Sequence, residues 1–285
     1  VNTIKDLDNS FTYNFGVDWF INKKNIIGFK IDGGPGSYNS NGNGTNTITQ
    51  YNNLGFEHLN AIVYTPDKWK TNNYNINAEH HFDTTGTVLN FTSDYTRLSE
   101  NYSSNIQNYF LDVNNKEILP ANIYRSDNLN TTEIFASKID FSKNIDSKSS
   151  FESGAKASFI NTNNNYLFER KDNLSGNYAK DTSLTNNYTY SEQTYAIYFN
   201  YIKSFKKINL QIGVRGENTN LLGRNTIKSF KLERNYYNLF PNMSIEYSLS
   251  NNHTLQLNLN RRIDRPQYSD LNPFRFYRDQ YSYDE

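Results

Sequence analysis

The stretch that decides the fold lies near the start of the chain and reads FTYNFGVDWFI, Phe11–Ile21. Its odd positions are all aromatic or aliphatic, and its even positions are polar or glycine except at Phe20. A period of two places successive side chains on opposite faces of a β-strand. A polar turn follows at residues 22–25, and the alternation resumes at Ile27, Phe29 and Ile31. The stretch therefore predicts a β-hairpin with one apolar face.

The same arrangement recurs along the chain and predicts four further hairpins. Their short polar turns are expected at residues 83–86, 143–148, 206–207 and 250–253, each between two alternating runs. Short turns between alternating runs are the sequence signal of antiparallel pairing. Together the five hairpins predict about ten strands.

The connections between these hairpins are predicted to be long. They cover about residues 35–70, 100–130, 163–186 and 223–234, with a last excursion from about 263, and some contain further alternation. Short turns that alternate with long loops are typical of outer-membrane barrels, whose periplasmic turns are short and whose extracellular loops are long. Residues 1–285 are therefore predicted to form one all-β, antiparallel transmembrane β-barrel domain in the cell outer membrane.

The composition excludes several other classes. The chain has no cysteine, 29 basic and 29 acidic residues, 36% hydrophobic residues and a mean hydropathy of -0.81. Zero formal charge argues against a nucleic-acid partner, and the aromatic content of 15% argues against disorder. A barrel needs apolar side chains only at alternate strand positions, so it scores as hydrophilic.

Aromatic residues near the predicted strand ends are expected to form girdles at the membrane interfaces. They are Trp19, Phe20, Trp69, Tyr74, Phe82 and Phe205. A soluble sandwich of two sheets would show the same alternation, and it stays open as an alternative.

The most distinctive segment is RRIDRPQYSDLNPF, Arg261–Phe274. It resembles the strand-to-loop signature of the outer-membrane β-barrel family of Bacteroidetes TonB-dependent receptors, and residues 18–25, 213–217 and 236–241 look similar to that family too. The resemblance implies a barrel of 22 strands, a plug and an energy-coupling box. This chain shows neither plug nor box, so we interpret it as part of a larger barrel.

The same resemblance implies energised uptake of a nutrient, which is a siderophore, a glycan or a peptide. The implied partners are outer-membrane lipid, the TonB complex through a plug absent from this chain, and a surface lipoprotein. No catalysis and no cofactor are expected. A passive or structural barrel and a soluble adhesin or binding module are the alternatives.

Ligand contact is expected from tyrosines in the outer loops, because tyrosine offers a stacking face with a polar tip. The candidates are Tyr38, Tyr51, Tyr109, Tyr124, Tyr166 and Tyr178. Arginines where a strand leaves the bilayer are candidates for an anionic ligand or for lipopolysaccharide phosphate. They are Arg261, Arg262 and Arg265. Ion pairs with Asp264, Asp270 and Glu217 are the preferred interpretation for these arginines.

No metal or catalytic motif is found. The adjacent His80 and His81 point to opposite faces of a strand, and His253 lies in a predicted turn, so no metal site is expected. Gly33-Gly34-Pro35-Gly36 lacks the Lys-Ser/Thr of a phosphate-binding loop and is interpreted as an ordinary loop. An omptin-like protease is a further alternative, but only His58 falls in an outer loop.

Overall fold

The computed structural model describes residues 2–47, 58–112, 114–227, 229–250, 252–264, 276–277 and 283–284. These residues form strands joined by turns, and they include no helix long and apolar enough to span a membrane. The strands are β1 (Asn2–Ser10), β2 (Tyr13–Asn22), β3 (Asn25–Thr47), β4 (His58–His81), β5 (Val88–Leu111), β6 (Glu117–Asp146), β7 (Ser149–Lys171), β8 (Tyr178–Lys180), β9 (Asn186–Ser204), β10 (Ile208–Asn225), β11 (Phe230–Ser250), β12 (His253–Asn260), β13 (Phe276–Tyr277) and β14 (Tyr283–Asp284).

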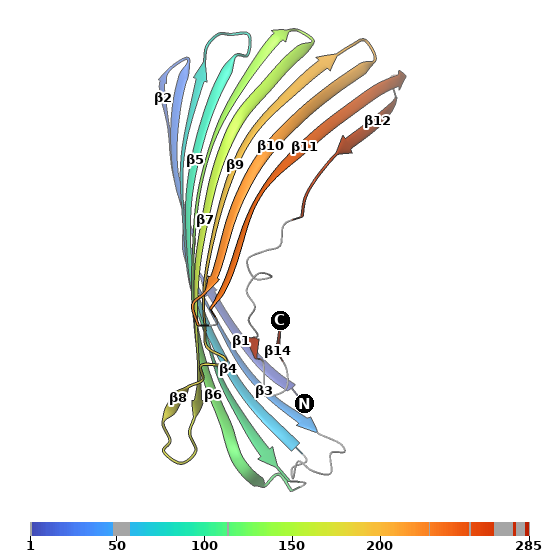
Figure 1. Cartoon of the computed structure of the whole chain (residues 1–285). Coiled ribbons are helices and arrows are strands. Elements are labelled where there is room, and N and C mark those ends of the chain that lie inside the picture. The colour runs from blue at the N-terminus through green and yellow to red at the C-terminus, as the bar shows by residue number, and fades with distance from the viewer. Residues whose placement is uncertain are drawn as a thin grey trace.

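Twelve of these strands make one antiparallel sheet, in which each long strand from β3 to β12 pairs with the next long strand along the chain. The path across the sheet is β1-β3-β4-β5-β6-β7-β9-β10-β11-β12. Strands β2 and β1 pair with successive halves of β3, so together they occupy one position at the edge of the sheet. The path thus has ten positions, which confirms the predicted all-β antiparallel meander of about ten strands. Figure 1 shows the strands running side by side along one strongly curved sheet.

The five predicted short turns are confirmed, and they gather at one end of the sheet (Figure 1). They join β2 to β3, β4 to β5, β6 to β7, β9 to β10, and β11 to β12. Side chains of short polar residues hold them, as expected for Asx-type turns. Asn22 Oδ1 accepts a hydrogen bond from Lys24 N at 2.8 Å, and Asp146 Oδ1 accepts one from Lys148 N at 2.7 Å.

At the opposite end most residues of the predicted long connections are strand, so the strands extend further than the predicted bounds and the loops are shorter. Strand β5 continues to Leu111 and β6 begins at Glu117, while β10 continues to Asn225 and β11 begins at Phe230. Many residues on both faces of these strand extensions are polar, so the alternation there is weaker than in the turn-proximal half although the backbone ladder is continuous. About 9–11 residues of a tilted strand cross a bilayer. Strands β3 to β7 have 23–30 residues, so they continue well beyond it.

The register confirms that one face of the turn-proximal half is apolar. Phe91 pairs with Ile139, Ile139 with Ala155, and Ala155 with Ile197 across four neighbouring strands. These side chains cover no second layer, and Ile197 is 71% exposed. A face of this kind is stable only against an apolar environment such as lipid.

The buried residues lie mainly on the other, polar face, in the strand extensions. One cluster comprises Ile106, Tyr124, Tyr166 and Phe168. A second comprises Tyr188, Tyr190 and Leu221. Trp69 also belongs to this polar face, because it pairs with Gly36 and Glu100 in the ladder. Its predicted place in an aromatic girdle was therefore wrong, since Trp69 and Tyr74 are five residues apart and point to opposite sides of β4.

Candidate ligand-binding surface

The polar face of the turn-proximal half carries paired charges. Lys138 Nζ lies 2.8 Å from Asp140 Oδ2, and Arg215 Nε donates a hydrogen bond to Glu217 Oε1 at 2.6 Å. Both cations also contact the ring of Tyr198, at 5.8 Å from Lys138 Nζ and 5.6 Å from Arg215 Cζ to the centroid. Both cations are thus paired with a carboxylate, and Glu217, for which the sequence predicted a pair with Arg261, Arg262 or Arg265, pairs with Arg215.

Two of the predicted ligand residues come together in the extensions. Tyr124 on β6 and Tyr166 on β7 flank Phe168, with centroid separations of 5.6 Å and 6.3 Å to its ring. Tyr124 is 7% exposed and Tyr166 is 3% exposed. Within the described part of the chain these tyrosines therefore support the wall by packing, with little of their surface open to a ligand.

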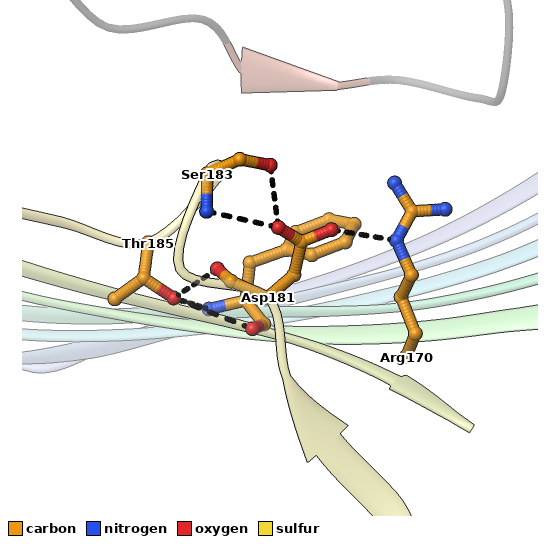
Figure 2. A network of polar contacts seen from close by, with 5 residues as sticks. Arg170, Asp181, Ser183 and Thr185 are labelled. Carbon is orange, nitrogen blue, oxygen red and sulfur yellow. Dashed lines mark hydrogen bonds and ion pairs between the residues drawn. The ribbon is translucent and has the colours of Figure 1, made fainter. Parts of the chain in front are cut away.

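A polar network closes the connection between β7 and β9 over this cluster (Figure 2). Arg170 Nε donates to Asp181 Oδ2 at 2.7 Å, and Ser183 N donates to Asp181 Oδ1 at 3.0 Å. Thr185 Oγ1 donates to the carbonyl oxygen of Asp181 at 2.7 Å, and Phe168 N donates to Thr185 Oγ1 at 3.2 Å. Partial burial would raise the pKa of Asp181, but the hydrogen bonds from Ser183 and Arg170 outweigh it and lower that pKa.

Another predicted residue, Tyr178 on β8, lies on the opposite side of the same connection. The guanidinium of Arg125 stacks on its ring, with Cζ 4.1 Å from the centroid. Arg125 Nε also donates to Glu169 Oε2 at 2.5 Å. Tyr178 thus helps to hold the β8 hairpin against β6 and β7.

The remaining predicted site residues are dispersed. Tyr38 lies on the polar face of β3 between Asp8 and Asp67. Tyr109 lies on the other face of β5 and donates its hydroxyl to Gln107 Oε1 at 2.8 Å. Arg261 and Arg262 follow the end of β12 and are exposed. Tyr51 and Arg265 lie outside the described residues. A role in ligand binding stays a prediction for all nine residues.

Sequence reasoning missed a set of buried asparagines on the polar face of the extensions. Asn186 and Asn225 are 0% and 2% exposed, and Asn225 Nδ2 donates to Asn186 Oδ1 at 2.5 Å. Asn164 is 2% exposed and donates to Asn128 Oδ1 at 2.8 Å. Asparagine is ordinarily a surface residue, so composition alone assigned these positions to loops. These amide pairs link neighbouring strands of the extensions.

The histidines and acidic residues of the described ranges do not gather into a metal site. Those ranges hold no group of three or more His, Cys, Asp or Glu residues that would bind a metal ion. His80 Nδ1 contacts Asn25 Oδ1 at 2.7 Å, whereas His81 contacts Glu79. The two histidines thus use different partners on opposite faces, and the absence of catalysis stays an expectation.

The apolar face contains a shallow hollow of about 880 Å³. Small residues leave it open, among them Ala155, Ala157 and Gly216, and the larger Ile197 and Leu239 border it. Because its side chains offer few hydrogen-bonding groups, this hollow does not belong to a site for a polar ligand.

The sequence matches the model of the outer membrane protein β-barrel family over residues 80–285. No curated protein sequence matches the chain. Solved structures with a similar arrangement include the ferric-catecholate import receptor Fiu of Escherichia coli in its closed form. The sequence identity is 9% and the TM-score is 0.47, and the match covers 90% of this chain and 49% of that chain.

The siderophore receptor PiuA of Acinetobacter baumannii is similar at 8% identity and a TM-score of 0.45, with coverages of 90% and 48%. The outer membrane protease OmpT of Escherichia coli is similar at 9% identity and a TM-score of 0.26, with coverages of 86% and 95%. The chain spans about half the length of the two receptors. Because the family match covers most of the sequence, the chain belongs to the outer membrane protein β-barrel family and resides in the outer membrane.

Proposed function

We propose that this chain is the barrel portion of a TonB-dependent receptor of the Bacteroidetes type, and that it takes up a scarce nutrient with energy supplied from the inner membrane. The observation that carries the proposal is the length of the strands. Strands β3 to β7 continue far beyond the bilayer and build a polar, aromatic wall outside it. A passive pore needs no such wall, whereas a receptor gains binding surface from it.

The open sheet supports a larger assembly. Among the described residues β12 does not pair with β1 or β2, so the sheet keeps two edges. Unpaired strand edges are not stable in the hydrocarbon region of a membrane. We propose that further strands close the barrel, that the short turns face the periplasm, and that a plug domain links the barrel to the TonB complex.

Nutrient uptake by cells that carry the full-length gene tests this function. Cells with and without the gene are grown on limiting ferric chelates, oligosaccharides or peptides. Each uptake measurement is repeated with a protonophore, which removes the energy source, and in a strain without TonB. The proposal expects gene-dependent uptake of at least one solute that stops under both treatments. Gene-dependent uptake that continues unchanged would identify a passive barrel, and uptake that does not depend on the gene would identify a structural one.

The passive barrel is the second candidate function, and the ion pairs on the turn-proximal polar face are compatible with it. Lys138–Asp140 and Arg215–Glu217 line this face without a net charge, as in a water-filled lumen. These pairs suit either function, whereas the long extensions suit the receptor better.

A further inference from the structure

A pocket of about 460 Å³ opens on the polar side of the sheet where its first strand is interrupted. It lies between the end of β1, the start of β2, and the middle of β3 and β4. Its lining includes Ser10, Asn14, Asp32, Trp69, Thr71 and Asn73. Pockets that bind small molecules have volumes of roughly 300–1,000 Å³, so this one has the size for a single small ring or a short chain of rings.

The pocket exists because of the Gly33-Gly34-Pro35-Gly36 segment, which is strand and not the loop that the sequence predicted. Gly33 and Gly34 both have a φ of 153°, in the region that favours glycine. A Cβ at Gly34 would lie 1.8 Å from the carbonyl oxygen of Phe11, and one at Gly33 would lie 2.1 Å from that of Thr71. The close backbone approach therefore requires glycine at both positions, and there the pocket is lined by backbone alone.

Trp69 forms an aromatic wall of this pocket. Trp69 is half-buried and pairs directly with Gly36 on β3. One edge of its indole ring, formed by Nε1, Cε2 and Cζ2, lies over Gly36. The ring stands on the polar face of the sheet, among hydroxyl, amide and carboxylate groups. A partly exposed tryptophan in such surroundings offers an apolar surface beside polar groups, which suits an amphipathic ligand.

The polar groups beside Trp69 are held in fixed positions. Asn73 Nδ2 donates to Asp32 Oδ2 at 2.8 Å, and Lys30 Nζ lies 2.9 Å from Asp32 Oδ1. Thr96 Oγ1 donates to Asn73 Oδ1 at 2.8 Å and so fixes the orientation of that amide. A carboxylate has about four acceptor positions, so Asp32 keeps capacity for hydroxyl groups of a ligand.

The charge of the pocket selects the class of ligand. Its lining includes the carboxylate of Asp32 and no basic side chain, because Lys30 is not part of the lining. The ion pair with Lys30 balances the charge of Asp32, so the lining offers no uncompensated cation to an anionic chelate or an acidic peptide. A neutral sugar ring has hydroxyl groups around its edge that both donate and accept, and C–H groups on its faces that pack against an aromatic ring.

We propose that this pocket binds a pyranose ring of a neutral carbohydrate, with one C–H face of the sugar against Trp69 and sugar hydroxyls on Asp32 and Asn73. The assignment rests on the proposed function, because the pocket meets a nutrient only if this wall borders the path of that nutrient through a receptor. Among the siderophore, glycan and peptide considered as nutrients, the assignment selects a glycan. Binding itself does not require energised transport, so it can be measured separately.

Calorimetric titration of the full-length protein in detergent tests the assignment. The probes are the methyl pyranosides of glucose, galactose, mannose and xylose, with the corresponding oligosaccharides, at millimolar concentrations. We expect at least one probe to bind. Trp69→Ala should weaken it by at least about tenfold, which corresponds to about 1.4 kcal/mol, whereas Trp69→Phe should retain most of the affinity. Trp19→Ala is the matched control, because Trp19 lies on the apolar face.

Two results would overturn the assignment. The first is the absence of binding by every pyranoside while the protein remains folded, and the second is binding that Trp69→Ala leaves unchanged. The uptake experiment separates this outcome from a failure of the proposed function. Energised uptake without pyranoside binding refutes only the carbohydrate assignment, and pyranoside binding without energised uptake refutes only the receptor function.

Discussion

Gly36 and Trp69 pair across strands β3 and β4, and the indole edge occupies the space in which a side chain at position 36 would stand. A Cβ at Gly36 would come within 2.3 Å of Trp69 Cε2 and Cζ2. Glycine at this position is thus required by the position of the ring, and the ring in turn forms a wall of the pocket.

Gly36→Val should therefore displace the Trp69 ring from the pocket. Valine is compatible with a strand, so the sheet should persist while acrylamide quenching of Trp69 fluorescence changes. All variants carry Trp19→Phe, which removes the other tryptophan of this chain. The fluorescence of a second protein, with both Trp19→Phe and Trp69→Phe, is subtracted so that only the signal of Trp69 remains. Gly42→Val is the control, because a Cβ there meets only Val63 O, at 3.9 Å. Equal quenching in the two valine variants would contradict the packing of Trp69 on Gly36.

The network around Asp181 should stabilise the connection between β7 and β9. Asp181→Asn removes the ion pair with Arg170, whose side chain is 51% exposed, so the loss should be about 0.5–1 kcal/mol. Hydrogen exchange of the amides in residues 172–185 should accelerate severalfold, with little change in β6. Glu233→Gln breaks the exposed pair with Lys231 and serves as the control. Unchanged exchange after Asp181→Asn would show that the connection is held by packing alone.

Asp146 predicts a pH dependence of the turn between β6 and β7. Hydrogen bonds from Ser149, from the Lys148 amide and from Lys203 lower its pKa to about 2. A depressed pKa in the folded state gives stability that is present above the unfolded value of about 3.9 and is lost as the pH falls through 2. The difference in unfolding midpoint between the wild type and Asp146→Asn should thus be largest above pH 4 and shrink toward pH 2. A difference independent of pH would refute this role of the carboxylate.

Neighbouring residues on β10 should respond differently to a new charge. Ile212 lies on the apolar face between Tyr201 and Met243, whereas Gln211 lies on the polar face. Ile212→Lys should destabilise the folded protein in lipid by about 2–4 kcal/mol if the site is near the bilayer midplane. Gln211→Lys should cost much less, as unfolding in urea with lipid vesicles would show. Equal destabilisation would mean that neither face contacts lipid.

The sequence predicted the strands of the turn-proximal half well, because only one of their faces is apolar. Residues 11–21 and 27–31 alternate cleanly, and the turn between them was placed correctly. The sequence placed the extensions within long connections that contain some further alternation, but their bounds could not be predicted because segments such as Ser37–Gly42 are polar on both faces. Their strand structure comes from pairing with distant segments, which a single sequence does not display.

The pocket was missed for a related reason. Gly33-Gly34-Pro35-Gly36 has the composition of a loop, and only the register with β4 brings Trp69 beside it. The spacing of five residues between Trp69 and Tyr74 was a usable signal, since an odd spacing in a strand reverses the face. The contact between Arg125 and Tyr178 joins residues far apart in the sequence, so no local sequence pattern predicts it.

The central claim is that this chain is the wall of an outer-membrane barrel with its apolar face toward lipid. Nitroxide labels at Ile212→Cys and Gln211→Cys, one at a time in lipid vesicles and with any cysteine outside residues 1–285 replaced by serine, test it directly, because these 285 residues include no cysteine. The account predicts that the label at 212 is relaxed mainly by oxygen, which dissolves in lipid, and the label at 211 mainly by a water-soluble nickel chelate. Equal accessibility of the two labels to both reagents would contradict the account.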